Sequence, residues 1–126
     1  FAGTYNYRAF LFSLGSTFKT GNPYTTVMEG NEITMENGEP TINFNLPNDD
    51  TLDSYFRTDF SAAYNFKLDD TFRGRINIAL LNIFNRKNAL ETYYRLQTND
   101  DGEISVNKIE QFSLGFTPNI SFRLLF

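Results

Sequence analysis

The chain has 126 residues, a net charge of −4 and 17% aromatic residues, and it contains neither cysteine nor histidine. This length favours one domain, and the missing residue types exclude disulfides, thiolate metal sites and histidine-based catalysis, so we expect no enzyme and no metal or other cofactor. The 11 Lys and Arg residues are scattered along the chain, which excludes the basic stripe of a nucleic-acid-binding protein.

The first strand is predicted over about residues 8–19, where apolar side chains alternate with smaller or polar ones. Alternation with a period of two over this length indicates a β-strand with one apolar face. The long polar segment 20–53 follows. Its Asn37-Gly38 dipeptide is typical of a type I′ turn, so we expect a hairpin within this segment.

The second and third strands are predicted over residues 55–68 and 73–84, joined by a short turn at Asp69-Asp70. In both strands the even-numbered positions are mainly apolar or aromatic, and the odd-numbered positions are mainly polar, charged or small. We expect the polar face to carry a structural network in which opposite charges on neighbouring strands pair. The charged residues of this face are Arg57, Asp59, Lys67, Arg73, Arg75 and, from the last strand, Arg123.

A second long polar segment, about residues 86–110, leads to the fourth predicted strand, 112–126. Asp101-Gly102 within this segment favours another hairpin. The fourth strand again alternates, and its apolar positions are Leu114, Phe116, Pro118, Ile120, Phe122, Leu124 and Phe126. Acidic side chains in the two long segments lack the spacing of a calcium loop and are interpreted as solvated turns: Asp49, Asp50, Asp53, Asp100, Asp101 and Glu103.

Aromatic side chains in the two long segments are the candidate ligand contacts. Tyr24, Tyr93 and Tyr94 can stack on a sugar or on an aromatic ligand, and packing within the loops is the alternative interpretation. No motif with a known spacing joins them, so the sequence defines no further ligand-binding residue.

The order of short and long connections is typical of an outer-membrane barrel, in which short turns lie on one side and long loops on the other. A strand of about ten residues is about 33 Å long and, at a tilt of about 40°, spans the lipid-facing band of about 25 Å. The predicted fold is therefore all-β, an antiparallel transmembrane β-barrel segment. A soluble small-ligand-binding β-barrel is the alternative, and it requires all of its strands within this chain.

Three stretches, "SYFRTDFSAAYNFKL", "GRINIALLNIFNRKN" and "SLGFTPNISFRLLF", resemble the C-terminal end of TonB-dependent outer-membrane receptors, especially those of the Bacteroidetes type. The most specific parts are the segment 82–85 and the terminal Phe126. The resemblance implies a barrel of about 22 strands in the bacterial outer membrane, with residues 1–126 as its last four strands and two long extracellular loops. It also implies active uptake of a nutrient such as a siderophore, a glycan or a peptide.

The same resemblance implies the partners. They are outer-membrane lipid, the rest of the barrel, an N-terminal plug domain that is absent from this sequence, and a TonB-type energy-coupling protein that acts through the missing N-terminal part. We therefore expect this sequence, which opens on Phe1 without a methionine, to be a fragment of a longer chain. The resemblance further implies that the barrel-assembly machinery reads the last strand, with Phe122, Leu124 and Phe126 as the signal.

Overall fold

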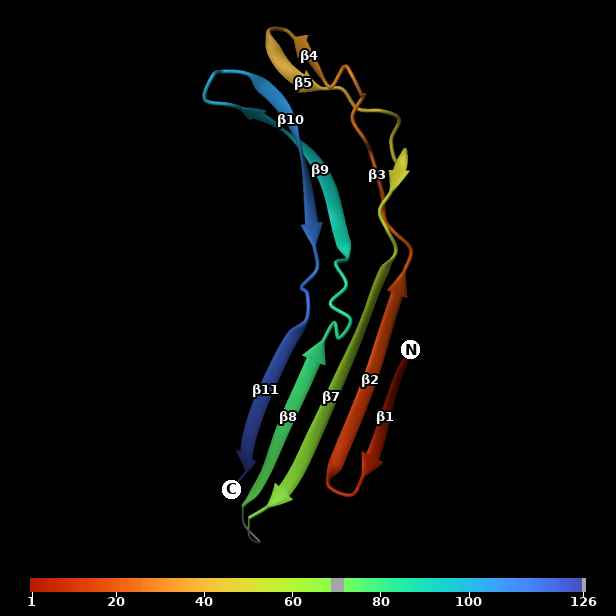
Figure 1. Cartoon of the computed structure of the whole chain (residues 1–126), viewed down its shortest axis with the longest axis vertical. Coiled ribbons are helices and arrows are strands. Elements are labelled where there is room, and N and C mark those ends of the chain that lie inside the picture. Colours follow the sequence, from red (N-terminus) through yellow and green to blue (C-terminus); the bar gives the residue numbers. More distant parts are fainter. Residues whose placement is uncertain (69–71, 126) are drawn as a thin grey trace. The chain divides into compact units, whose positions relative to one another are not determined.

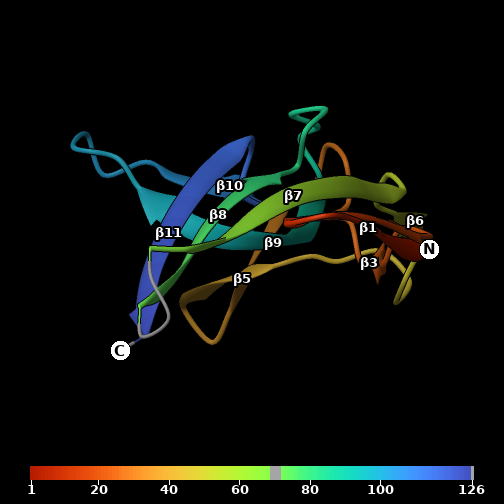
Figure 2. The ribbon, with the colours of Figure 1, turned by 90° about the horizontal axis from the view of Figure 1, so that it is seen from below.

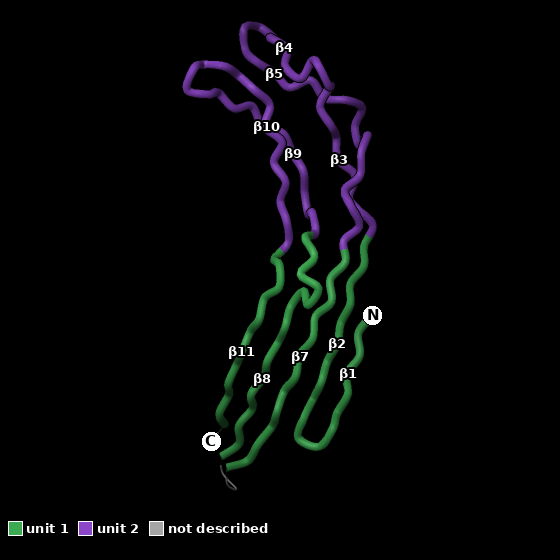
Figure 3. The backbone as a smooth tube through the Cα atoms, viewed as in Figure 1, with its two compact units in different colours: residues 1–19, 56–87, 114–126 green, residues 20–55, 88–113 purple. Residues whose placement is uncertain are grey.

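The computed structural model describes residues 1–68 and 72–125, which form antiparallel sheets (Figure 1). They divide into two compact units (Figure 3). Unit 1 comprises Phe1–Lys19, Phe56–Lys87 and Leu114–Phe126, and unit 2 comprises Thr20–Tyr55 and Asn88–Ser113. In the described part of the chain, no helix has the length and apolar character needed to cross a membrane.

Unit 1 is built on a five-stranded antiparallel sheet in the order β1-β2-β7-β8-β11 (Figures 1 and 2). Its strands are β1 Ala2–Tyr7, β2 Phe10–Lys19, β7 Tyr55–Lys67, β8 Arg73–Leu81 and β11 Thr117–Leu125. The five strands lie in the sheet in the same order as along the chain, and each is antiparallel to the one before. The connections from β2 to β7 and from β8 to β11 therefore leave the sheet at one end. The β1–β2 turn lies at the other end, where β7 ends and β8 begins. Among the described strands the sheet does not close, and β1 and β11 are its edges.

The all-β prediction is confirmed, but the sheet has five strands and not four. The additional strand is β1, which pairs with β2 through a turn at Arg8 and Ala9. Arg8 has a positive φ of 52°, which is uncommon for a residue other than glycine. The strand expected over 8–19 therefore begins at Phe10, because a turn without glycine or proline leaves little trace in the sequence.

Two further strand boundaries differ from the prediction, because the segment 82–85 forms a turn. The strand expected over 73–84 ends at Leu81, and the strand expected over 112–126 begins at Thr117. Asn82 and Asn85 have φ values of 51° and 49°, a conformation that asparagine adopts more readily than most residues. The Asn85 Oδ1 accepts a hydrogen bond of 2.8 Å from the Phe116 backbone N–H, so this turn also sets where β11 begins.

Asn82 is the polar centre of this turn and is only 1% exposed. Its Nδ2 donates hydrogen bonds of 3.0 Å to the carbonyl oxygens of Arg86 and Leu114. Its backbone N–H donates to the Asp59 Oδ1 on β7 at 2.8 Å. Through its side chain and its backbone N–H, Asn82 thus connects the end of β8 to β7 and to the segment that enters β11.

The register of the sheet gathers the apolar side chains on one face. Residues that lie directly opposite each other across neighbouring strands share a face, and Phe60 lies opposite Leu80, which in turn lies opposite Pro118. The Phe12 and Phe60 rings stack with centroids 6.5 Å apart, which joins β2 to β7 on this face. The apolar face comprises Tyr5, Tyr7, Phe10, Phe12, Leu14, Phe60, Tyr64, Phe66, Ile76, Ile78, Leu80, Pro118, Ile120, Phe122 and Leu124.

The opposite face of the sheet is mainly polar. It carries Thr4, Asn6, Ser13, Arg57, Asp59, Ser61, Asn65, Lys67, Arg73, Arg75, Asn77, Thr117, Asn119, Ser121 and Arg123. We call these two surfaces the apolar face and the polar face.

Unit 1 has almost no hydrophobic core of its own. Among the described residues, Ala63 is the only hydrophobic residue that is buried, at 2% exposure, whereas Ile120 on the apolar face is 74% exposed. A sheet is stable when its apolar face packs against another layer or another apolar medium. Contiguous exposed apolar surface on this scale marks a contact with a protein or a membrane.

Unit 2 contains the two hairpins that the sequence predicts. Its strands are β3 Pro23–Tyr24, β4 Ile33–Glu36, β5 Glu39–Ile42, β6 Asp50–Thr51, β9 Ala89–Thr98 and β10 Ile104–Phe112, paired as β3–β6, β4–β5 and β9–β10. Asn37 and Gly38 both have positive φ, 54° and 84°, as a type I′ turn requires. Asp101-Gly102 instead lies in a longer loop, in which the Gly102 N–H donates to the Asn99 carbonyl oxygen at 2.9 Å.

Replacing Asn82 by glycine tests the role of its side chain. Asn82→Gly keeps a residue that tolerates positive φ but removes the donors to Arg86 and Leu114. We expect the free energy of unfolding to fall by about 1–3 kcal/mol, because buried hydrogen bonds are lost. Urea unfolding in detergent micelles measures it. The matched control is Asn37→Gly in the exposed β4–β5 turn, and equal losses in both variants would contradict the assigned role.

Candidate functional site

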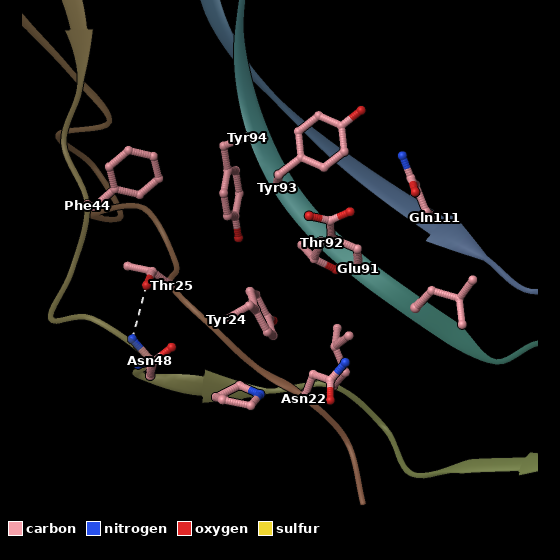
Figure 4. A pocket seen from close by; sticks show the side chains of 13 residues that line it. Asn22, Tyr24, Thr25, Phe44, Asn48, Glu91, Thr92, Tyr93, Tyr94 and Gln111 are labelled. Carbon is pink, nitrogen blue, oxygen red and sulfur yellow. Dashed lines mark hydrogen bonds between the residues drawn. The ribbon is translucent and has the colours of Figure 1, made fainter. Parts of the chain in front are cut away.

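A cleft of about 570 Å³ opens in unit 2 between the segment 22–52 and the β9–β10 hairpin (Figure 4). Ring faces, amide groups, hydroxyl groups and one carboxylate line it. The lining residues are Asn22, Pro23, Tyr24, Thr25, Phe44, Asn48, Leu52, Leu90, Glu91, Thr92, Tyr93, Tyr94 and Gln111. This volume lies in the range of small-molecule sites, which is about 300–1,000 Å³.

Two of the three tyrosines singled out from the sequence come together here. Tyr24 on β3 and Tyr94 on β9 project into the cleft from its two sides (Figure 4). Tyr93 also borders the cleft, but its side chain projects from the opposite face of β9, because successive side chains of a strand alternate (Figure 4). Phe44 joins the aromatic wall, with its ring centroid 6.3 Å from that of Tyr94 in an edge-on arrangement.

A hydrogen bond fixes the Tyr24 ring. Its hydroxyl donates to the Asp50 Oδ2 at 2.6 Å across the β3–β6 pair. This bond is the main cause of a raised pKa for the Tyr24 phenol and of a lowered pKa for the Asp50 carboxyl. The Lys108 Nζ lies 5.8 Å from the Tyr24 ring centroid, a cation–π contact. The Tyr24 hydroxyl is therefore already hydrogen-bonded, and the Tyr24 ring is held in place at the wall of the cleft.

The neighbouring Asp49 closes the first long segment. It accepts a hydrogen bond of 2.7 Å from the Thr26 backbone N–H and a second one from the Thr26 hydroxyl. The Asn45 Nδ2 donates to that same hydroxyl oxygen at 2.7 Å. Asp49 and Asp50 are exposed, as expected of acidic residues in a turn, and both carboxylates also hold the segment that carries Tyr24.

Thr92 on β9 has an unusual environment for a hydroxyl group. It is 7% exposed, it lines the cleft, and its Oγ1 makes no hydrogen bond within the described part of the chain. It lies on the same face of β9 as Tyr94, two residues further along the strand. A buried hydroxyl without a partner costs about 1–3 kcal/mol, which makes Thr92 a candidate ligand contact at the wall of the cleft.

The charge of the cleft is one-sided. Glu91 lines it, and its described lining residues include no lysine or arginine. Lys108, which contacts the Tyr24 ring, has its Nζ 2.8 Å from the Glu110 Oε1. This ion pair, through its hydrogen bond, raises the pKa of Lys108. The cleft therefore suits a neutral or cationic ligand better than an anionic one.

The polar face of unit 1 differs from the predicted charge network. The Arg57 Nε lies 2.7 Å from the Asp59 Oδ1, within one strand. At the other end of the sheet, the register places cations opposite each other, Lys67 with Arg73 and Arg123 with Arg75. No carboxylate of the described residues forms an ion pair with these four. At these four positions, like charges therefore lie opposite each other on neighbouring strands in the described part of the chain.

The expected assembly signal is described only in part. Phe122 and Leu124 lie on the apolar face of β11, whereas Phe126 and the expected turn at Asp69-Asp70 lie outside the described residues. Phe44 and Thr92 were missed from the sequence, since Phe44 lies in an irregular polar segment and Thr92 resembles any strand threonine. No family model matches the chain, and no match to it is found among the curated proteins or the solved structures.

The hydrogen bonds to Asp49 predict a pH effect. They lower the pKa of Asp49, so the folded segment binds fewer protons than the unfolded one. Their contribution to stability is present above the ordinary Asp pKa of about 3.9 and is lost as the pH falls through the lower folded value. NMR titration of the Asp49 carboxyl carbon should show a midpoint below that ordinary value.

Two variants test the cause of this shift. Thr26→Val removes the donating hydroxyl, and we expect it to move the Asp49 midpoint upward. Thr98→Val, at the exposed end of β9, is the matched control and should leave the midpoint unchanged. An unchanged midpoint in Thr26→Val would mean that another contact lowers the Asp49 pKa.

Proposed function

We propose that this chain forms the last strands of the outer-membrane β-barrel of a TonB-dependent receptor and takes part in the active uptake of a nutrient. The observation that carries the proposal is the two-faced sheet of unit 1. Its apolar face contacts outer-membrane lipid, and its polar face lines the lumen. The resemblance of three stretches of the sequence to the C-terminal end of such receptors supports the same assignment.

The distribution of aromatic residues supports a membrane rather than a protein partner for the apolar face. The Phe56 and Phe84 rings stack with centroids 6.0 Å apart near the end of the sheet from which the long segments leave. The Phe66 and Phe122 rings stack 6.2 Å apart near the opposite end. Aromatic residues at both ends of an apolar band are typical of the two girdles of a membrane barrel.

The sheet edges support a larger barrel. Strands β1 and β11 have neighbours on one side only among the described strands. In hydrocarbon each unsatisfied backbone group costs several kcal/mol, so both edges require further strands. A soluble small-ligand-binding barrel would have to close within this chain, whereas the described strands form an open sheet. The remaining strands, the plug domain and the TonB-type protein are therefore part of the receptor proposal.

In this proposal, the two ends of the sheet lie on the two sides of the membrane. The long segments 20–55 and 88–113, which make up unit 2, leave the same end, and in this proposal they are extracellular. The short turns at the other end are periplasmic. The cleft between Tyr24 and Tyr94 is then part of the extracellular ligand-binding region.

Cysteine labelling in the assembled protein tests the orientation of the sheet. The chain has no cysteine, so Ile120→Cys and Phe60→Cys report the apolar face, and Asn119→Cys and Ser61→Cys report the polar face from the same strands. We expect a lipid-soluble maleimide to modify positions 60 and 120, and a water-soluble one to modify positions 61 and 119. Equal reaction of neighbouring positions with both probes, or recovery of the protein outside the outer-membrane fraction, would contradict the proposal.

A further inference from the structure

We propose that the unit 2 cleft binds an uncharged oligosaccharide. The proposal deepens the proposed function and rests on it for the place of the cleft outside the membrane. Three features carry it: two fixed aromatic rings, a buried hydroxyl without a partner among the described residues, and the lack of any lysine or arginine among the described residues that line the cleft.

The aromatic rings suit sugar rings. One face of a hexose ring presents C–H groups, which are apolar and slightly positive, and these groups lie favourably on the electron-rich face of an aromatic ring. Tyr24 and Tyr94 project into the cleft from opposite sides (Figure 4). Tyr24 is held by Asp50, and Tyr94 contacts Phe44, so both rings lose little freedom when a ligand binds.

The polar groups suit hydroxyls. A sugar hydroxyl both donates and accepts, so it needs partners of both kinds. The amide of Asn22 supplies a donor and an acceptor. This side chain has no hydrogen bond to another described residue. Thr92 Oγ1 adds a buried hydroxyl that a ligand hydroxyl can satisfy.

Charge and polarity disfavour the other ligand classes. An anionic chelate or a phosphate ester would find no lysine or arginine among the described lining residues, and Lys108 is engaged by Glu110. A purely apolar ligand would leave the Thr92 hydroxyl and the amide of Asn22 without partners, at a cost in affinity. A neutral ligand that is rich in hydroxyls pairs these groups and uses the ring faces as well.

Calorimetry on the intact protein in detergent tests the proposal. The probes are the neutral hexasaccharides maltohexaose, cellohexaose, laminarihexaose and mannohexaose, together with the anionic hexagalacturonate and the neutral peptide hexaglycine. We expect at least one neutral saccharide to bind and the anionic saccharide and the peptide to bind at least tenfold more weakly. Absence of binding by all four neutral saccharides, or tighter binding of either other probe, would overturn the proposal.

Paired variants place the binding in this cleft. Tyr94→Ala removes one ring, and Thr92→Val replaces the unpartnered hydroxyl by a methyl group of similar size, so it preserves the fold. We expect each to weaken saccharide binding about tenfold or more. Their matched controls are Tyr5→Ala, on β1 and outside the cleft, and Thr98→Val, at the exposed end of β9, and neither should change affinity by more than about twofold. Unchanged binding in both Tyr94→Ala and Thr92→Val would overturn the assignment.

A separate uptake measurement distinguishes this proposal from the transport proposal. Cells that contain the intact protein receive the bound saccharide in radiolabelled form, with and without their TonB-type protein. Binding that is lost in Thr92→Val but accompanied by no TonB-dependent uptake supports the cleft and contradicts the transporter. TonB-dependent uptake that is equal in Thr92→Val and Thr98→Val supports the transporter and contradicts the cleft.

Discussion

The register of the five-stranded sheet is the constraint on which the rest of unit 1 depends. Because side chains alternate with a period of two, a slip of one residue between any two strands would move a whole set of aromatic side chains to the polar face. Phe60 opposite Leu80 and Ile120 opposite Ile78 show that the register keeps β7, β8 and β11 in phase. Ala63 is the only buried hydrophobic residue of the sheet among those described. The sheet must therefore be stabilised by a medium or a partner that covers its apolar face.

Much of this architecture could be predicted from the sequence, because alternation is a local signal that packing does not override. The long strands, the two faces and both loop hairpins all follow from it. The turns that determine the strand ends could not be predicted as readily. Arg8 and Asn82 adopt positive φ although neither is a glycine, the residue that would indicate such a turn in the sequence. Asn82 is stabilised by the hydrogen bonds that its side chain donates to the carbonyl oxygens of Arg86 and of the distant Leu114.

The site was less predictable, because its residues matter through contacts between segments that are distant in sequence. Tyr24 and Tyr94 could be chosen as exposed loop aromatics, but nothing in the sequence indicates that Asp50 orients the Tyr24 hydroxyl. Thr92 is the clearer case, since its burial and its lack of a partner are properties of the fold and not of the residue type.

The two units are stabilised by different kinds of interaction, so substitutions in the two units affect stability in different ways. Unit 1 relies on its apolar face, and the stability that this face contributes depends on the surrounding medium. Unit 2 relies on hydrogen bonds such as those of Asp49 with Thr26 and Asp50 with Tyr24, which operate in water. A change in the cleft wall that leaves these bonds intact alters neither the register nor the apolar face of the sheet. Sequence variation in the cleft can therefore change which ligand is bound while the strands of unit 1 remain the same. Many binding proteins likewise carry their binding residues on loops that a rigid scaffold positions.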